Sequence, residues 1–345
     1  MIPKIYYNVV ADFIFSIIRI LEEEEFKNNN MIRRFKMNND IVEYISHVKK
    51  NINPILKRDM NYSCGKFCRG LIVLMLYAVD EGINDIECLL ERINDMSGKE
   101  FINIIIDKLE LNIPDNVSDQ EVEQIFQEEM IKELEDFDKV QIYMDYYKYP
   151  DDMKERLVKT LSDYYYKFFK DIEENTKIFM YKKLQEHIDL IEKDVDKFFE
   201  NILLMMDKKQ VMSKEVVFYI NYFSEFGCSI VYENNKYVIY YGYNLEQRYD
   251  EEMKTIVYKE LINILSDSNR FNIMKLLGKR AWYSKELADH LGITTATMSY
   301  HIKKITGLGI IDIHSGKNKR LYYKLNNDKF KKIIDNMVLD IIEDK

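Results

Sequence analysis

One stretch of the chain decides the fold, Leu265 to Asn326, which reads LSDSNRFNIMKLLGKRAWYSKELADHLGITTATMSYHIKKITGLGIIDIHSGKNKRLYYKLN. Apolar residues in its first part recur at helical spacing, and the pattern stops at Gly278, a residue type that often follows the end of a helix. The spacing therefore predicts a short amphipathic helix here. The residues expected on its apolar face are Phe271, Met274 and Leu277.

Two more short helices are predicted directly after the first one. Ser284 is placed to N-cap a helix over Lys285–Leu291, which Gly292 ends, and Thr294 is a favourable N-cap for the next helix. Two short helices joined by such a turn form a helix-turn-helix, whose second helix can enter the major groove of DNA. The inward-facing residues of the earlier helix are expected to be Leu287, Ala288 and Leu291.

The last of these helices has two chemically different faces. Met298, Ile302 and Ile305 follow the i, i+4, i+7 spacing and are expected in the core. The opposite face is small near the start of the helix and basic near its end, which suits base edges and phosphates respectively. Hydroxyls and backbone N–H groups in the first turn can also meet phosphate. The residues predicted to contact DNA are Thr295, Ala296, Thr297, Ser299, Tyr300, Lys303 and Lys304.

A β-hairpin with a basic tip is predicted after Gly309. Its strands are Ile310–His314 and Arg320–Leu325, and the loop is Ser315–Asn318. Three cations sit at the tip and are predicted to contact phosphates as a wing. They are Lys317, Lys319 and Arg320.

Charge is distributed unevenly along the 345 residues, whose total net charge is −9. Residues 266–325 hold eleven Lys and Arg against four Asp and Glu, a net charge of +7, which leaves −16 on the rest of the chain. An acidic total does not suit a protein coated in positive charge for nucleic acid. A basic module on an acidic body suits a protein that binds nucleic acid through one face.

This stretch resembles the winged-helix domain of the ArsR-type bacterial repressors over about Glu252 to Asn336. Several of that family's motifs occur here in order. They are carried by Leu265, Asp267, Arg270, Ile273, Leu276 and Leu277; then by Glu286–Ala288, Leu291 and Gly292; and then by Thr297, Ser299, His301, Ile302, Lys303 and Ile305. The resemblance implies a homodimer that binds a palindromic operator in double-stranded DNA and releases it when an effector binds.

The resemblance also bears on individual residues. It favours a DNA contact for His301, against the alternative of a polar residue that flanks the helix core. The rival interpretation of Tyr300 is an exposed aromatic packed on a neighbouring helix. The flanking helices expected over Thr255–Leu265 and Phe330–Ile341 carry apolar residues, and such helices form the dimer interface in this family. Alternatively, both helices simply pack on their own domain.

No metal site and no cofactor are predicted. Metal-sensing members of the family carry paired cysteines where this chain has Tyr283–Glu286, and histidines on the last helix, where Asp328–Lys345 has none. Cys64 and Cys68 would share one helical face, so a metal or redox site there is an alternative to a buried pair of free thiols. Catalytic motifs of the nucleotide-binding, esterase and metalloprotease types are absent, and no catalytic residue is predicted.

The chain is predicted to be mainly α with small β elements, in three parts. Residues 1–213 form a helical region for sensing or dimerisation, 214–248 a small β-meander that closes it, and 249–345 the winged helix-turn-helix. The meander strands are expected at Val216–Phe223, Cys228–Tyr232 and Lys236–Tyr241, with a turn at Asn234–Asn235. Capping boxes at Ser97 and Ser118 start helices. Pro150 suits the first turn of a helix that runs through Met153 to about Glu173, and a separate helix is expected from about Thr176 to Met206.

The predicted function is a sequence-specific, DNA-binding transcription regulator, a dimeric repressor controlled by an unknown signal through the N-terminal region. The alternatives are a winged-helix protein-interaction module, or a regulator fused to a small-molecule-binding domain. The chain is expected to be cytoplasmic and not an enzyme. It shows no basic leader with a cleavage site, and its longest uncharged apolar run, Leu71–Val79, is too short to span a membrane.

Overall fold

The computed structural model describes residues 3–22, 37–64, 69–109, 111–114, 117–132, 140–195, 198–199, 214–233, 236–244, 251–315 and 321–342. The fold is mainly helical with two small sheets, as the sequence predicts. Its buried apolar residues form two clusters. One extends from Ile5 to Tyr243, and the other from Leu261 to Leu325.

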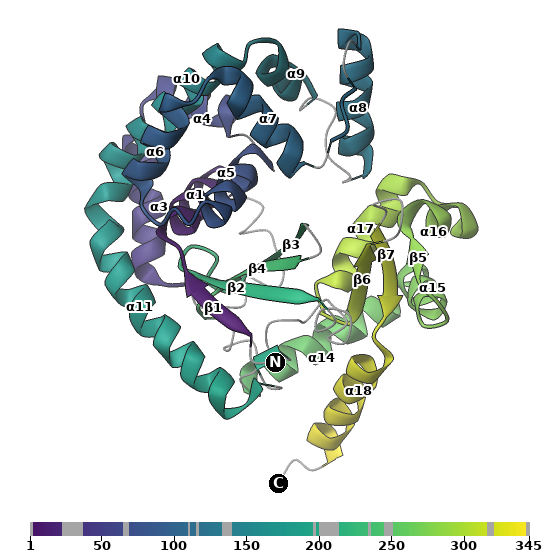
Figure 1. The fold of residues 1–345 in the computed structure, drawn as a ribbon. Helices are drawn as coiled ribbons and strands as arrows, with labels where there is room; N and C mark the ends of the chain where they lie inside the picture. Colours follow the sequence, from purple (N-terminus) through teal and green to yellow (C-terminus); the bar gives the residue numbers. More distant parts are fainter. Residues whose placement is uncertain are drawn as a thin grey trace.

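The first cluster is built from a four-stranded sheet and the helices around it (Figure 1). Its helices are α1 (Val9–Leu21), α3 (Asn39–Asn51), α4 (Pro54–Ser63), α5 (Arg69–Asp80), α6 (Ile86–Asp95), α7 (Gly98–Lys108), α8 (Asp119–Lys132), α9 (Val140–Lys148), α10 (Pro150–Tyr164) and α11 (Lys170–Lys193), with a π-helical segment η3 (Tyr165–Phe169). Its strands are β1 (Lys4–Tyr7), β2 (Glu215–Asn221), β3 (Cys228–Glu233) and β4 (Lys236–Gly242).

The second cluster belongs to the C-terminal region. Its elements are α14 (Glu251–Ser266), α15 (Ser268–Leu277), β5 (Trp282–Tyr283), α16 (Ser284–Leu291), α17 (Thr295–Thr306), β6 (Ile311–Ser315), β7 (Leu321–Leu325) and α18 (Asn327–Ile342).

Local sequence signals explain most helix starts in the first cluster. At Ser97 the capping box is complete, because the side chains of Ser97 and Glu100 each bond the other's backbone N–H. Pro150 occupies the first turn of α10, where its missing N–H costs nothing. The predicted break between residues 173 and 176 is wrong. The helix continues from α10 through η3 into α11 and ends at Lys193, since no glycine or proline interrupts it. The π-helical segment η3 adds a wider turn between α10 and α11 without breaking the helix.

The sheet has the order β1-β2-β4-β3, so the predicted meander is wrong. β2 lies parallel to β4, with Phe218 opposite Ile239, and β3 lies antiparallel to β4 on its far side. Because β4 lies between β2 and β3, the connection over residues 222–227 has to pass over the end of β4. The turn predicted at Asn234–Asn235 falls outside the described residues.

β1 was not predicted, because the sequence continues from it into an apolar run that reads as helix. Its four residues alternate between exposed and buried and pair in parallel with β2, with Ile5 opposite Phe218. The N-terminal region, predicted to be helical up to residue 213, therefore begins with a strand of the same sheet. Strand pairing over more than 200 residues leaves no local trace in the sequence.

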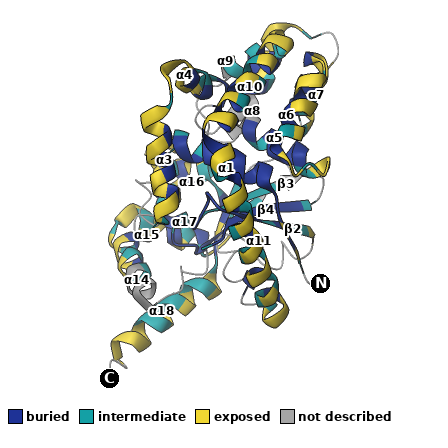
Figure 2. Ribbon diagram, turned by 90° about the vertical axis from the view of Figure 1, so that its left-hand side faces the viewer, coloured by how far each residue is buried: buried dark blue, intermediate teal, exposed yellow. Residues whose placement is uncertain are grey.

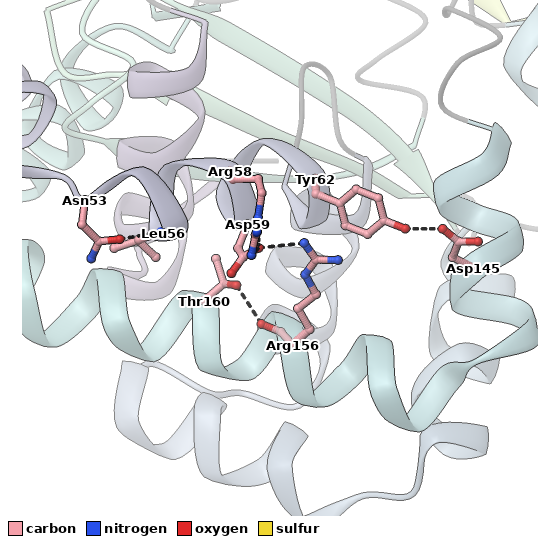
Figure 3. A network of polar contacts seen from close by, with 8 residues as sticks. All are labelled: Asn53, Leu56, Arg58, Asp59, Tyr62, Asp145, Arg156 and Thr160. Atoms are coloured by element: carbon pink, nitrogen blue, oxygen red, sulfur yellow. Dashed lines mark hydrogen bonds and ion pairs between the residues drawn. The ribbon is translucent and has the colours of Figure 1, made fainter.

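Helices pack against this sheet and against one another (Figure 1). α11 packs against β1 and β2, α1 packs against β2, and α10 packs against α4, α6, α7 and α9. A polar network joins three of these helices (Figure 3). Arg156 of α10 lies 2.7 Å from the Asp59 carboxylate of α4 and 4.1 Å from the centre of the Tyr62 ring, and Tyr62 donates a hydrogen bond to Asp145 of α9. Among the described residues, none of the helices is long and apolar enough to cross a membrane.

Candidate nucleic-acid interface

The helix-turn-helix consists of α16, a tight turn and α17. Gly292 ends α16 with φ of 65°, a left-handed conformation that favours glycine. Thr294 caps α17, because its Oγ1 accepts a hydrogen bond from the backbone N–H of Thr297 at 3.1 Å. Both assignments confirm the sequence prediction. Ser284, predicted to be a cap, is instead the first residue of α16, and Tyr283 takes the cap position without a side-chain bond.

The core beneath this motif holds α17 in place. Met298, Ile302 and Ile305 are buried as predicted, with Met298 and Ile305 fully so. On α15, however, Phe271 is 45% exposed and Ile273 takes the predicted inward place beside Met274 and Leu277. Helical spacing favours Ile273, because it lies four residues before Leu277 and so about one turn away, whereas Phe271 lies six residues before Leu277.

The outer face of α17 presents most of the predicted contact residues. Tyr300 is 54% exposed, and Lys304 places its ammonium 5.8 Å from the centre of the Tyr300 ring. Ser299 donates its hydroxyl to the Thr295 carbonyl at 2.9 Å, which keeps the side chain against the helix. The remaining exposed members are Thr295, Ala296, Thr297 and Lys303, while Ser299 and Lys304 are half-buried. DNA contact by these residues stays a prediction.

His301 lies on the other side of α17 and corrects the prediction made for it. Its side chain is only 6% exposed, and its Nδ1 is buried without a hydrogen-bond partner among the described residues. One residue beyond Tyr300, the helix has turned by about 100°. The pKa of Asp267, the N-cap of α15, is lowered mainly by a hydrogen bond from the Arg270 backbone N–H. The nearby His301 ring makes a smaller contribution in the same direction. His301 thus belongs to the packing between α15 and α17.

The hairpin after α17 is present as predicted, and a third strand joins it. β6 and β7 pair antiparallel, and β5 pairs with β7, with Trp282 opposite Tyr323. Sequence reasoning missed β5, because two residues are too few to show a strand pattern. The basic tip, with Lys317, Lys319 and Arg320, lies outside the described residues.

Sequence reasoning also missed a cation beside the helix-turn-helix. The Arg280 guanidinium stacks 3.5 Å from the centre of the Trp282 ring and lies 2.6 Å from the Glu286 carboxylate. Trp282 in turn donates from Nε1 to the Leu276 carbonyl at 3.1 Å. This chain of contacts joins the end of α15 to the start of α16.

The two helices that flank the winged helix lie against each other. Tyr258 of α14 donates a hydrogen bond to Asp340 of α18 at 2.6 Å. α14 buries Leu261 and Ile264, whereas none of the residues of α18 is buried among those described. The last turns of α18 form an exposed end (Figure 2), with an apolar set that we call the α18 face: Val338 (43% exposed), Leu339 (48%), Ile341 (71%) and Ile342 (74%).

Within the described part of the chain, no group of three His, Cys, Asp or Glu side chains is arranged to hold a metal ion. Cys64 is buried, and Cys68 falls outside the described residues, so the Cys64–Cys68 alternative is not tested.

The C-terminal region is similar to known DNA-binding proteins. A family model described as a helix-turn-helix domain matches residues 265–314. The arsenical resistance operon repressor of Staphylococcus aureus is 32% identical over 83 residues, which cover 23% of this chain and 79% of that protein. Both matches concern the region that contains α15, α16 and α17.

Proposed function

Because its C-terminal region belongs to the ArsR-type winged helix-turn-helix regulators, and the chain is accordingly a DNA-binding regulator, we propose that this protein is a dimeric, sequence-specific repressor. The observation that carries the proposal is the outer face of α17. This face carries an exposed aromatic side chain, small side chains and lysines, while the opposite face of the same helix is buried in the core.

In the proposed complex, α17 lies in the major groove of double-stranded DNA. Its N-terminal turn, with Ala296 and Ser299, approaches base edges, and Tyr300 contacts a base or sugar. Lys303 and Lys304 contact phosphates, which position the helix without reading sequence. The wing cations, Lys317, Lys319 and Arg320, add phosphate contacts beside the groove.

Dimerisation is the second part of the proposal. One winged helix reads only a few base pairs, so two copies related by a twofold axis are needed for tight binding to a palindromic operator. The α18 face supplies an apolar surface beside α14, where Ile262 is also 54% exposed. A second copy that covers this surface would remove several large aliphatic side chains from water.

The N-terminal region is proposed to receive the signal that releases the operator. We propose that it does so without catalysis and without a bound metal, and that the protein acts in the cytoplasm. A protein-interaction module remains the second candidate, and the DNA-binding experiment decides between the two.

Selection from random double-stranded DNA tests the proposal. Wild-type protein should enrich one sequence with twofold symmetry, and Tyr300→Ala should change which bases are enriched. Tyr149→Ala is the matched control, since Tyr149 is a 59% exposed tyrosine at the start of α10. If wild-type protein enriches nothing and is not retained on duplex DNA at low salt, the repressor proposal is wrong and the interaction module replaces it.

A further inference from the structure

The connection between β2 and β3, residues 222–227, is the feature we call the strap. It crosses the end of β4, the strand from which the chain leaves the N-terminal region toward α14. The exit, by which we mean residues 242–244 at the end of β4, forms three backbone hydrogen bonds with the strap and with the residues at its two ends. Gly242 N–H donates to the Gly227 carbonyl at 2.9 Å, Tyr243 N–H to Asn221 at 3.2 Å, and Asn244 N–H to Glu225 at 3.0 Å.

The strap is packed too tightly over β4 for any side chain at residue 242. A Cβ added to Gly242 would lie 2.0 Å from the Glu225 carbonyl oxygen and 2.1 Å from its carbon. These are backbone atoms, which a rotamer change cannot move. Glycine at 242 is therefore required for the strap to close on the exit.

Glu225 is held in an unfavourable state at the centre of the strap. Its φ is 41°, the left-handed region, and among the described residues it alone is a non-glycine with positive φ. Its side chain is fully buried, and its Oε1 accepts a hydrogen bond from the Asn38 N–H at 2.7 Å. Strained backbone and a buried carboxylate together persist only where the surroundings over-determine them, and such positions concentrate at switches.

The strap also contacts the helices on either side of it. The Asp12 carboxylate of α1 accepts the Tyr222 N–H at 2.6 Å, and Arg19 of the same helix is near enough to favour the charged form of Glu225. Asn38, the N-cap of α3, donates its side-chain amide to the Tyr243 hydroxyl at 2.8 Å. The rings of Tyr222 and Tyr243 stack at 5.5 Å, and Phe179 of α11 packs edge-on against both. Movement of α1, α3 or α11 would therefore act on the exit.

We propose that the strap is a latch that couples the N-terminal region to the DNA-binding region by holding residues 242–244, and that its release frees these residues and so lengthens the connection between the two regions. The mechanical part stands by itself, while its effect on DNA rests on the proposed function. In the proposed released state the Glu225 carboxylate loses its hydrogen bond from the Asn38 N–H and its backbone leaves the left-handed region, so the two states would differ at a few residues.

Two variants open the latch by independent routes. Gly242→Ala pushes the strap away through its backbone, and Glu225→Ala removes the buried carboxylate. Glu225→Gln keeps an acceptor for Asn38 and provides a milder version in case the alanine variant does not fold. Glu215→Gln is the control, because it removes an exposed carboxylate from the start of β2.

Hydrogen exchange and small-angle scattering on the full chain test the mechanical part. In Gly242→Ala and Glu225→Ala the amides of residues 242–244 should exchange at least tenfold faster and the maximum dimension in solution should increase, with a smaller increase in exchange for Glu225→Gln, while the control matches wild type. Folded variants with wild-type exchange or wild-type scattering would overturn the latch.

Affinity for the selected operator tests the coupling. The latch variants should bind at least threefold more weakly than wild type, with the control within twofold. An opened latch with unchanged affinity would overturn its regulatory role. A wild-type protein that binds no DNA would refute the proposed function, while exchange and scattering would still decide the latch.

Discussion

The two regions of this molecule differ in where most of their functionally distinctive charged and polar side chains lie. In the C-terminal region the residues proposed to contact DNA lie outside, on the face of α17, above a small and mainly aliphatic core, and among the described residues only His301 and Asp312 are buried polar side chains. In the N-terminal region, charged groups are inside: Asp12, Glu225 and Arg19 are all buried, and burial raises the pKa of both carboxyls to about 7. The first arrangement suits recognition of an external charged partner. The second places ionisable groups inside the fold, where a signal that alters their contacts or protonation would change the stability of this region.

The comparison requires that the two cores are stabilised independently, and the first prediction tests this. Ile305→Ala removes a fully buried side chain from the C-terminal core and should cost about 2–5 kcal/mol of that region's stability. Trp282, the single tryptophan of the chain, lies in this core, so its fluorescence in urea reports the C-terminal region alone. Far-UV circular dichroism reports mainly the N-terminal helices and should change little.

Ile178→Ala serves as the control for that experiment, since Ile178 of α11 is 61% exposed and lies outside the surface proposed for dimerisation. A parallel shift of both transitions by Ile305→Ala would show that the regions unfold as one unit and that the comparison is wrong.

Stability against pH should separate the regions next. Asp12 and Glu225 have folded-state pKa values near 7, above those of the unfolded chain, so the folded state holds more protons between about pH 4 and 7. The stability of the N-terminal region should therefore fall as pH rises from 5 to 7 and level off above, by on the order of 1–3 kcal/mol. Asp267 has a lowered pKa, so its contribution in the C-terminal region is lost only under more acidic conditions.

Urea unfolding at pH 5, 6, 7 and 8 measures this slope by circular dichroism. Glu225→Gln should make this slope smaller, and the part that remains is that of Asp12. An N-terminal region that gains stability from pH 5 to 7, with the same slope in wild type and variant, would contradict the burial of charge described above.

A smaller effect is expected from single cations on α17. Lys303→Ala should weaken binding to all duplexes alike and lower the slope of log affinity against log salt by about one. Lys182→Ala, an exposed lysine on α11, should change neither. A loss with Lys303→Ala that is confined to one DNA sequence would mean that Lys303 reads bases rather than phosphate.

Removal of metal should have no effect at all. Purified protein should contain no stoichiometric zinc, nickel or cadmium, and a chelator should leave operator affinity within twofold. One metal per chain by elemental analysis would contradict this, and Cys64→Ser would then test whether the Cys64–Cys68 pair holds it.

The same difference between the regions explains what the sequence could and could not predict. The C-terminal region depends on local signals, such as Thr294 as a cap and Gly292 as a stop, and these are readable without a structure. The burial of His301 was missed because the family resemblance favoured a DNA contact, although its spacing, three residues after Met298 and four before Ile305, places it on the buried face. β1 and the strap depend on pairings between residues that are far apart in sequence, such as Ile5 with Phe218 and Asp12 with Tyr222. No local pattern carries such information.

The central claim is that two copies of α17 read one palindromic operator. Hydroxyl-radical footprinting of wild-type protein on its selected duplex tests this most directly, with the oligomeric state confirmed by light scattering at micromolar concentration. The account predicts a dimer and two protected patches related by twofold symmetry, with half-site centres about 10 base pairs apart. A stable monomer that protects a single asymmetric patch, or no protection of any sequence, would contradict it.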